Sequence, residues 1–450
     1  MEQIDEVLNE MPKSFWMFLT IIFVSSAVVS LLGWEVLFLS IMALFLGVFG
    51  WELWLHYIRQ NFISGITWVV LEIIPPREVA RSPKAMELFF TNALYHWSMK
   101  GGREAIWQGA VWFWFSLEIV SIEGQIHFYI RTPSRIKGLI ETQIYAQYPQ
   151  AYVKEVEDYT AAVDEISEKS EWNLWGCEWK LAKPDPYPIK TYVDFGLDKD
   201  PDEELKVDPL SPVIELFASM KKDEQMWLQI VVRPSKNKFK THGTWGDHHD
   251  WVRECELELE RVSAPWTKID KLPNGQILKS GRTPDSMKAT IDGLTKKPQK
   301  IGFDVGIRSC YVAKKHAFDL NHRRDIRLIF RQYANPVLNS LERYNGTQAD
   351  AYGGLITVLS QKKVMVLANR MLHEYKERNF FNHPMRNQWL HHIPWPISPT
   401  IFMAYFHSVT YVLNVEELAT LWHFPGQILK IPTLERVESK EASPPTNLPV

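Results

Sequence analysis

Two apolar runs lie almost back to back near the start of the chain. The first begins at Phe15 and ends at Leu32, and the second begins at Val36 and ends at Leu55. Neither contains Lys or Arg, and each approaches the roughly 20 residues that cross a bilayer core as a helix. Because only residues 33–35 separate them, the pattern predicts a two-helix transmembrane hairpin. A buried hairpin of a soluble protein and a cleaved signal peptide fit less well, because both runs lack a polar face and the first residues are acidic.

The charges that flank these runs predict their orientation. Basic residues follow the second run, at Arg59, Arg77, Arg81 and Lys84, whereas the short turn carries only Glu35. Basic flanks stay on the cytoplasmic side of a membrane. The chain is therefore expected in the inner (cytoplasmic) membrane, with the lipid bilayer as a partner and with both termini and most of the chain in the cytoplasm.

Beyond this anchor, residues 61–160 alternate between predicted strands and helices. Ser82-Pro83 and Thr132-Pro133 each place an N-cap residue before a proline, which is how helices often begin. Runs rich in β-branched and aromatic residues predict strands at 66–74, 113–120, 125–131 and 151–156. The resulting order, β-α-β-β-α-β, is that of a ferredoxin-like unit.

A similar order of elements is expected over residues 171–340. Strands are predicted at 188–193, 225–233 and 301–313, and helices at 208–220 and 321–333. The predicted fold is therefore α+β, with an N-terminal two-helix transmembrane hairpin (1–60) followed by tandem ferredoxin-like (βαββαβ) units on antiparallel sheets. Residues 341–425 are expected to be mainly helical, with Asn414 as the N-cap of a short helix, and residues 426–450 to form an extended Pro-rich tail.

Residues 235–300 form a long charged insertion in the second predicted unit. Lysines are spread along it, beside an acidic stretch at 254–260. A connection this long is usually functional or disordered. Both a solvated excursion and a basic contact to nucleic acid fit this pattern, and the formal net charge of −3 indicates no general affinity for nucleic acid. The three cysteines form no CxxC pair, which fits a reducing cytoplasm.

The chain carries no recognisable catalytic motif. A phosphate-binding GxxxxGK[ST] loop, a GxGxxG turn, a GxSxG elbow and an HExxH helix are all missing from the sequence. The metal-like groups are Asp247-His248-His249-Asp250 and His391-His392, for which no further ligands stand nearby at a suitable spacing. We therefore expect no catalytic residue, no cofactor and no metal site, and a protein that is not an enzyme.

Two sets of basic residues lie on predicted helices. Arg135 and Lys137 stand at the start of one helix, and Arg323, Arg324 and Arg327 lie on another. They could contact phosphates, although a solvent-facing helix surface is the simpler interpretation.

Three segments carry a resemblance to a known family. Residues 125–150 contain a strand, a Pro turn and the pattern E-x-Q-I-Y-A-Q-Y-P, residues 227–234 (WLQIVVRP) form a second segment, and residues 413–450 contain LNVEELATLWHFP and PPTNLP. Together they resemble the membrane and α+β region of the type IV coupling protein family, the TraD/TraG-like ATPases of conjugative DNA transfer. The residues that carry this resemblance are Glu141, Gln143, Tyr145, Gln147, Tyr148, Pro149, Asn414, Glu417, His423, Pro425, Pro445 and Asn447.

The resemblance implies a role without an activity of its own, because the chain lacks the ATP-binding motor of that family. We expect a non-enzymatic, membrane-anchored accessory or scaffold module of a conjugative or type IV secretion-like DNA or protein transfer system. Its expected partners are a separate P-loop motor ATPase docked in trans and further copies of the chain. The alternative is a stand-alone membrane-anchored protein that binds DNA through residues 235–300; DNA binding with a strong salt dependence would favour it.

Overall fold

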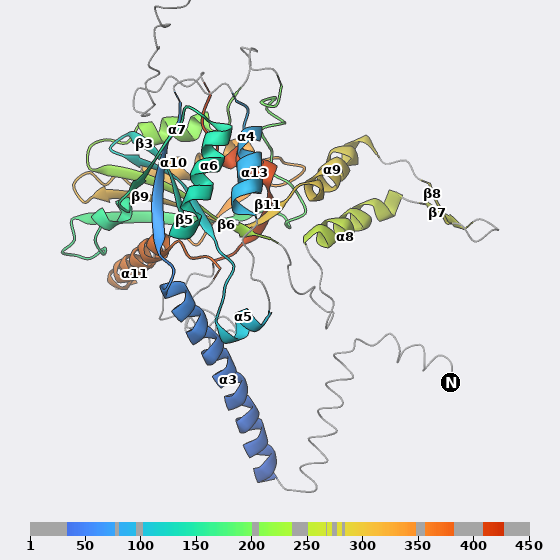
Figure 1. Cartoon of the computed structure of the whole chain (residues 1–450), viewed down its shortest axis with the longest axis horizontal. Coiled ribbons are helices and arrows are strands. Elements are labelled where there is room, and N and C mark those ends of the chain that lie inside the picture. Colours follow the sequence, from blue (N-terminus) through green and yellow to red (C-terminus); the bar gives the residue numbers. More distant parts are fainter. Residues whose placement is uncertain are drawn as a thin grey trace, which may run out of the picture. The chain divides into compact units, whose positions relative to one another are not determined.

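A computed structural model describes residues 34–76, 81–95, 102–199, 207–235, 251–266, 268–271, 277–280, 284–347, 356–381 and 408–426 (Figure 1). The chain divides into two compact units. The first takes residues up to 65 with 99–111 and 235–254, and the second takes 66–98, 112–234 and 255 onward. The sheet belongs to the second unit, and so do the three segments that resemble the coupling protein family.

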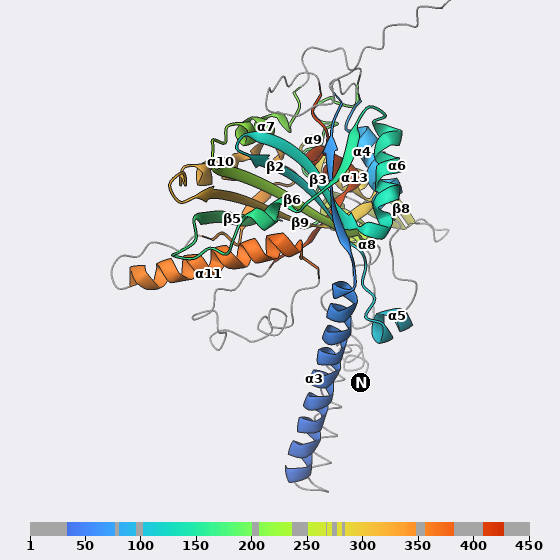
Figure 2. The same cartoon turned by 60° about the vertical axis from the view of Figure 1, so that its left-hand side comes forward.

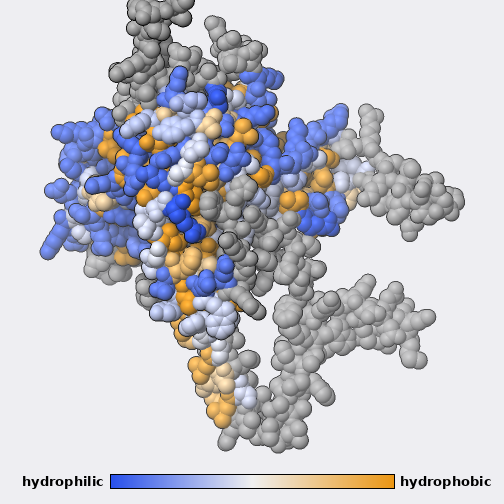
Figure 3. Space-filling model, viewed as in Figure 1, coloured by the Kyte–Doolittle hydropathy of each residue, from blue (hydrophilic) through white to orange (hydrophobic). Residues whose placement is uncertain are grey.

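The first unit contains the helices α3 (Trp34–Ser64) and α5 (Gly102–Trp107). Apolar side chains are exposed along α3, as Figure 3 shows, and Phe38, Leu46 and Tyr57 are more than half exposed. Gly109, just after α5, has a φ of +67°, and a side chain there would meet the backbone of Ile58 at 2.3 Å. This glycine therefore permits a close approach to α3 that other residues would prevent.

The predicted transmembrane hairpin is wrong. The run from Phe15 to Leu32 lies outside the described residues, and Trp34 and Glu35, expected in a turn, already belong to α3. The helix also continues past Leu55 through polar residues to Ser64, whereas polar groups in lipid are costly. Among the residues that the structure describes, no helix is both long and apolar enough to cross a membrane.

The second unit is built on one nine-stranded antiparallel sheet. Its strand order is β10-β5-β9-β6-β2-β3-β1-β4, with β11 paired to β9 beside this path. The strands are β1 (Trp68–Ile74), β2 (Phe115–Ile122), β3 (Gln125–Pro133), β4 (Tyr152–Val156), β5 (Trp172–Leu181), β6 (Glu224–Pro234), β9 (Gly302–Lys314), β10 (Leu341–Tyr344) and β11 (Tyr411–Asn414).

The sheet consists of two halves with the same strand order. Numbered within each half, β4-β1-β3-β2 and β10-β5-β9-β6 both follow the order 4-1-3-2. The halves do not have separate sheets, as the prediction of tandem units on antiparallel sheets implied, because β2 pairs with β6 from Phe115↔Val232 to Ile122↔Gln225. β2 and β6 are each the outermost strand of their own half, so pairing them leaves fewer exposed edges.

The first strand of the second half was placed wrongly by the sequence pattern. The described strand is β5, and residues 188–193 contain no strand. Ile189 and Tyr192 are buried because this segment packs under a helix. The backbone N–H of Ile189 donates to Glu417, and that of Tyr192 donates to Thr420. Burial against a helix can select the same apolar residues as burial in a sheet.

Helices cover both faces of the sheet. Figure 2 shows α11 (Ile356–Glu377) along one face, with α7 (Ser211–Ala218) and α10 (His322–Leu328) on the opposite side. The other described helices are α4 (Lys84–Phe89), continued by the π-helix η1 (Phe90–Leu94), α6 (Lys137–Gln147), α8 (Trp251–Ser263), α9 (Asp285–Lys296) and α13 (Val415–Leu421). A separate pair of strands, β7 (Lys268–Lys271) and β8 (Ile277–Ser280), and the helices α8 and α9 lie in the predicted insertion.

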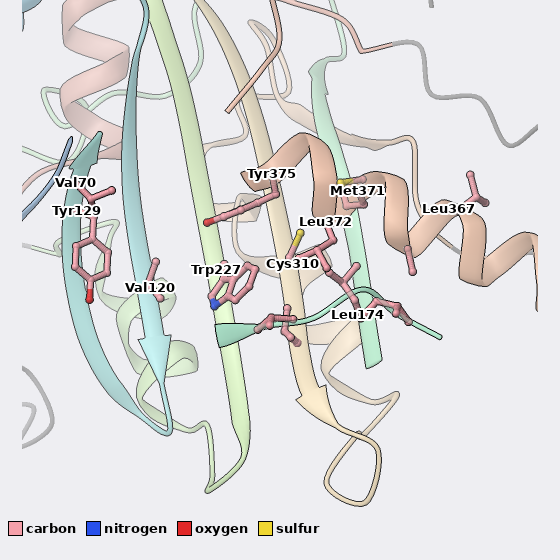
Figure 4. Packing of buried hydrophobic residues seen from close by; sticks show 14 residues of the cluster. Val70, Val120, Tyr129, Leu174, Trp227, Cys310, Leu367, Met371, Leu372 and Tyr375 are labelled. Carbon is pink, nitrogen blue, oxygen red and sulfur yellow. The ribbon is translucent and has the colours of Figure 1, made fainter. Parts of the chain in front are cut away.

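The apolar core under α11 joins the two halves. Figure 4 shows Met371, Leu372 and Tyr375 of α11 directed toward the sheet, where Trp227 of β6 and Cys310 of β9 are buried. The rings of Trp227 and Tyr375 lie 5.0 Å apart. Burial of such large side chains supplies most of the hydrophobic stabilisation of a core.

Candidate functional site

A segment of the second unit that follows α11 in the sequence is buried over almost its whole length. We call residues 411–424 the docking segment; it consists of β11, α13 and the three residues Trp422, His423 and Phe424. β11 pairs with the beginning of β9, from Tyr411↔Val305 to Asn414↔Gly302. Every residue from Tyr411 to Phe424 is buried except the partly exposed Glu416.

A capping box begins the helix of the docking segment. The Asn414 side chain accepts the backbone N–H of Glu417 at 2.9 Å, and the Glu417 carboxylate accepts the backbone N–H of Asn414 at 2.9 Å. This reciprocal pair satisfies two helix-end donors. The predicted N-cap role of Asn414 is therefore confirmed, and Glu417 completes the box.

Glu417 also forms a fully buried ion pair. The Nζ of Lys297 lies 3.1 Å from its carboxylate, and both side chains have 0 % exposure. The backbone N–H of Ile189 donates to the same carboxylate. Burial raises the pKa of Glu417, against the opposing effects of Lys297 and of the backbone hydrogen bonds. Because each partner would be an isolated buried charge without the other, the pair ties α13 to the residues that follow α9.

A second set of ionic contacts ties α13 to α4. Lys300 lies 2.8 Å from Glu87 of α4 and 2.6 Å from Glu416 of α13. The hydroxyl of Tyr192 donates to Glu87, and that of Thr191 donates to Glu416. Burial lowers the pKa of Lys300, but the bonds to the two carboxylates more than offset this and raise it overall.

Aromatic side chains at the end of the docking segment fill the layer of helices over the first half. The ring of Trp422 packs on Phe128 at 5.9 Å and on Phe90 at 6.2 Å. The ring of Phe424 packs on Phe128 at 5.4 Å and on Tyr148 at 5.0 Å. The docking segment therefore joins β9 of the second half to α4, α6 and β3 of the first.

His423 holds the same end by polar contacts. Its Nδ1 lies 2.9 Å from the carbonyl oxygen of Ala419, and its Nε2 lies 3.1 Å from the carboxylate of Asp208. Both partners offer acceptor oxygens to the ring nitrogens. Burial raises the pKa of Asp208, but the charge of His423 and the hydrogen bonds lower it overall.

The structure brings together two of the three segments that resemble the coupling protein family. Tyr148, at the end of the first, meets Phe424 in the third. On α6, Glu141 is 3.9 Å from Lys137, Gln143 and Gln147 are half-buried, and Tyr145 is 38 % exposed and accepts the backbone N–H of Val153. Pro149 is exposed, Pro425 is buried, and Pro445 and Asn447 lie outside the described residues.

A second buried polar feature runs across the sheet, and sequence reasoning missed it. Residues in register on adjacent strands form one polar row on the face under α11. Four of its members, Glu118, Glu178, Gln229 and Arg308, are no more than 1 % exposed. From β4 to β10 the row contains Lys154, Glu72, Tyr129, Glu118, Gln229, Arg308, Glu178 and Tyr344.

The end of α11 completes the polar row with charges of its own. Arg378 donates to Glu118 at 2.9 Å and also pairs with Asp158, and Glu374 accepts from Arg308 at 2.6 Å. Arg308 donates to Glu178 at 2.9 Å as well. Charged residues in the middle of three largely apolar strands, β2, β5 and β9, were the available sequence signal, but the partners are far apart in the chain.

Titratable groups around Glu118 are strongly perturbed. Burial is the main cause that raises the pKa of Tyr159 and of Tyr375, whose hydroxyls lie 2.9 Å apart. Burial also raises the pKa of Asp158, but Arg378 and Thr160 lower it overall. The side chains of Glu118 and Arg378 have 0 % exposure, so this cluster is a buried network rather than a cleft open to a substrate.

Two further predictions concern the basic residues Arg135 and Lys137 and the metal-like groups. The guanidinium of Arg135 lies over the ring of Phe113 at 4.1 Å, and Lys137 pairs with Glu155 at 2.6 Å. In the part of the chain that the structure describes, no group of acidic, His or Cys side chains could hold a metal ion. Residues 247–250 and 391–392 are not part of it.

One family model matches the chain. It is described as a domain of unknown function, DUF8128, and it matches residues 72–350. The match runs from β1 to just beyond β10 and so includes the polar row and both halves of the sheet, but it ends before α11 and the docking segment. No curated protein matches the chain.

Proposed function

The chain belongs to the DUF8128 family, and we propose that it is a non-enzymatic scaffold whose docking segment fixes where a motor ATPase binds. The proposed setting is a conjugative or type IV secretion-like transfer system. The partner would be a P-loop ATPase that engages residues 433–450, which lie beyond the docking segment in the sequence. The observation that carries this proposal is the burial of the docking segment, which contacts both halves of the sheet.

Several independent contacts hold the docking segment against the sheet. The Lys297–Glu417 pair, the Lys300 contacts and the packing of Trp422 and Phe424 all act within fourteen residues of one another. Any one of them would restrain the segment, and together they hold Phe424 in a single position relative to the sheet. A rigid attachment point of this kind lets a following segment present a partner in a defined orientation.

The buried charges support a structural role for the polar row. Each of Glu118, Arg308 and Arg378 is paired within the fold and is inaccessible to a substrate. Two lysines of the predicted insertion, Lys297 and Lys300, are likewise engaged by Glu417, Glu416 and Glu87. These contacts weaken the alternative in which the insertion binds DNA directly.

The test is recovery of the partner with the purified chain. The tagged chain would be isolated from its own cells and the bound proteins identified by mass spectrometry. We expect a P-loop ATPase that is lost when residues 433–450 are deleted or scrambled, and kept by the control variant Trp107→Ala, whose side chain is 71 % exposed. Recovery of the ATPase without residues 433–450, or ATP hydrolysis by the purified chain itself, would contradict the proposal.

A further inference from the structure

One exposed surface of the second unit concentrates arginines of two elements. We call Arg323, Arg324 and Arg327 of α10 together with Arg343 of β10 the arginine patch. Phe330, just after α10, packs on the ring of Trp179 at 4.7 Å, and Trp179 is the register partner of Arg343. This contact brings the end of α10 to the part of β5 where β10 pairs.

The arginines of the patch affect one another. Burial lowers the pKa of Arg327, and Arg343, Arg323 and Arg324 lower it further by their charges. Arg324, Arg327 and Arg343 are exposed, while Ile326 is buried. The charges therefore gather on the outer side of α10, in a chain whose formal net charge is −3. A local positive field against an acidic average attracts anions.

Three arginines of the patch differ from several other arginines of the unit. Arg308 and Arg378 are paired with carboxylates, and Arg233 pairs with Asp304 at 3.0 Å. Among the described residues, Arg323, Arg324 and Arg343 have no ion pair, and the buried Nε of Arg323 has no acceptor. The nearest acid on α10, Asp325, is bound by His322 at 3.1 Å.

We propose that the arginine patch binds the phosphate backbone of nucleic acid. Guanidinium groups match phosphate oxygens in a two-pronged geometry, and they stay charged under all physiological conditions. Residues three apart on a helix lie about 5–6 Å from each other, so Arg324 and Arg327 can meet successive charges of a polymer. An acidic peptide is the competing ligand, and the experiment separates the two.

The experiment measures binding of the full chain to a fluorescent DNA of about 20 base pairs, and to its single strand, over a series of salt concentrations. The test variant is Arg324→Gln/Arg327→Gln/Arg343→Gln. The matched control is Lys84→Gln/Lys169→Gln/Lys222→Gln, which removes the same charge from exposed positions elsewhere. Circular dichroism would verify that both variants remain folded.

We expect the chain to bind DNA with an affinity that falls as the salt concentration rises. Binding to the duplex or to the single strand would support the proposal. The slope of log affinity against log salt should fall by about 3 for the test variant, since each lost phosphate contact removes about 1. The control should retain the slope. Three results would overturn the proposal: no binding at low salt, equal loss in both variants, or displacement of DNA by an equal concentration of polyglutamate. None of these three results depends on residues 433–450, so the experiment does not test the proposal that a motor ATPase binds there.

Discussion

Glu118 shows how single residues organise this fold. Its carboxylate is fully buried in the middle of the sheet and accepts from Arg378, Tyr159, Ser116 and Gln229. Arg378 reaches it from the residue after α11 with a φ of +53°, a left-handed conformation that is rare for residues other than glycine. The structure keeps this unfavourable backbone because the guanidinium joins Glu118 to Asp158.

Replacing Arg378 by Met should destabilise the chain strongly. The change keeps the volume but leaves Glu118 as an unpaired buried charge, and we expect a loss of about 3–5 kcal/mol in the free energy of unfolding. Urea unfolding followed by tryptophan fluorescence measures it. The control Arg261→Met, at a side chain that is 78 % exposed, should leave the unfolding midpoint unchanged. A loss below about 1 kcal/mol would mean that Glu118 does not depend on Arg378.

The contact between Asp208 and His423 predicts a dependence of stability on pH. The pKa of Asp208 in the folded chain lies below its ordinary value of 3.8, so the ionised form is favoured by folding. Its contribution is fully present at pH values well above 3.8 and is lost as the pH falls through the folded pKa. Asp208→Asn should therefore be less stable at pH 7, by about 1–3 kcal/mol.

The difference between the two proteins should then shrink as the pH falls below about 4. Unfolding free energies at a series of pH values measure this convergence. As a control, Asp164→Asn changes an exposed carboxyl and should run parallel to the unchanged protein at every pH. Parallel curves for Asp208→Asn as well would show that His423 does not stabilise the ionised carboxylate.

Among the elements, the docking segment contributes large buried aromatic side chains to the packing of the second unit. Trp422 is fully buried and contacts aromatic rings of η1 and β3 as well as Phe424. Trp422→Ala should cost about 3–5 kcal/mol, because it leaves a large cavity among these buried rings. Hydrogen exchange should also become faster in β11, whereas Trp107→Ala should change neither property. An unchanged exchange rate in β11 would show that this strand is held without Trp422.

Several elements could be predicted because their signals are local. The strand predicted at residues 225–233 is β6, and the helix that Asn414 caps is α13. Apolar strands that end at a proline and an Asn or Ser before a helix are features of a few neighbouring residues. The convergence of Tyr148 and Phe424 could not be predicted, because nothing local relates positions so far apart.

The misplaced strand and the overlooked polar row have the same physical origin. Residues 188–193 are rich in apolar side chains because they pack under α13, and β5 was overlooked because Gly176 and Glu178 interrupt its apolar pattern. Yet Gly176 is required there: a side chain would approach Cys310 and Met371 to 2.9 Å. Glu178 is tolerated because Arg308 neutralises it. Both exceptions depend on partners from other strands and from α11, which the local pattern does not specify.

At the scale of the whole molecule, the two halves of the sheet should unfold together. They share the β2–β6 pairing, the polar row and the docking segment, so separating them would expose Glu118 and Trp422 at once. Native-state hydrogen exchange in rising urea measures this: peptides from β3 and from β9 should lose protection at the same free energy. A variant that breaks only the docking segment, Trp422→Ala, should lower both values equally. If β3 instead opened at a lower free energy than β9, the halves would be separate folding units, and the docking segment could not serve as a rigid attachment point for a partner.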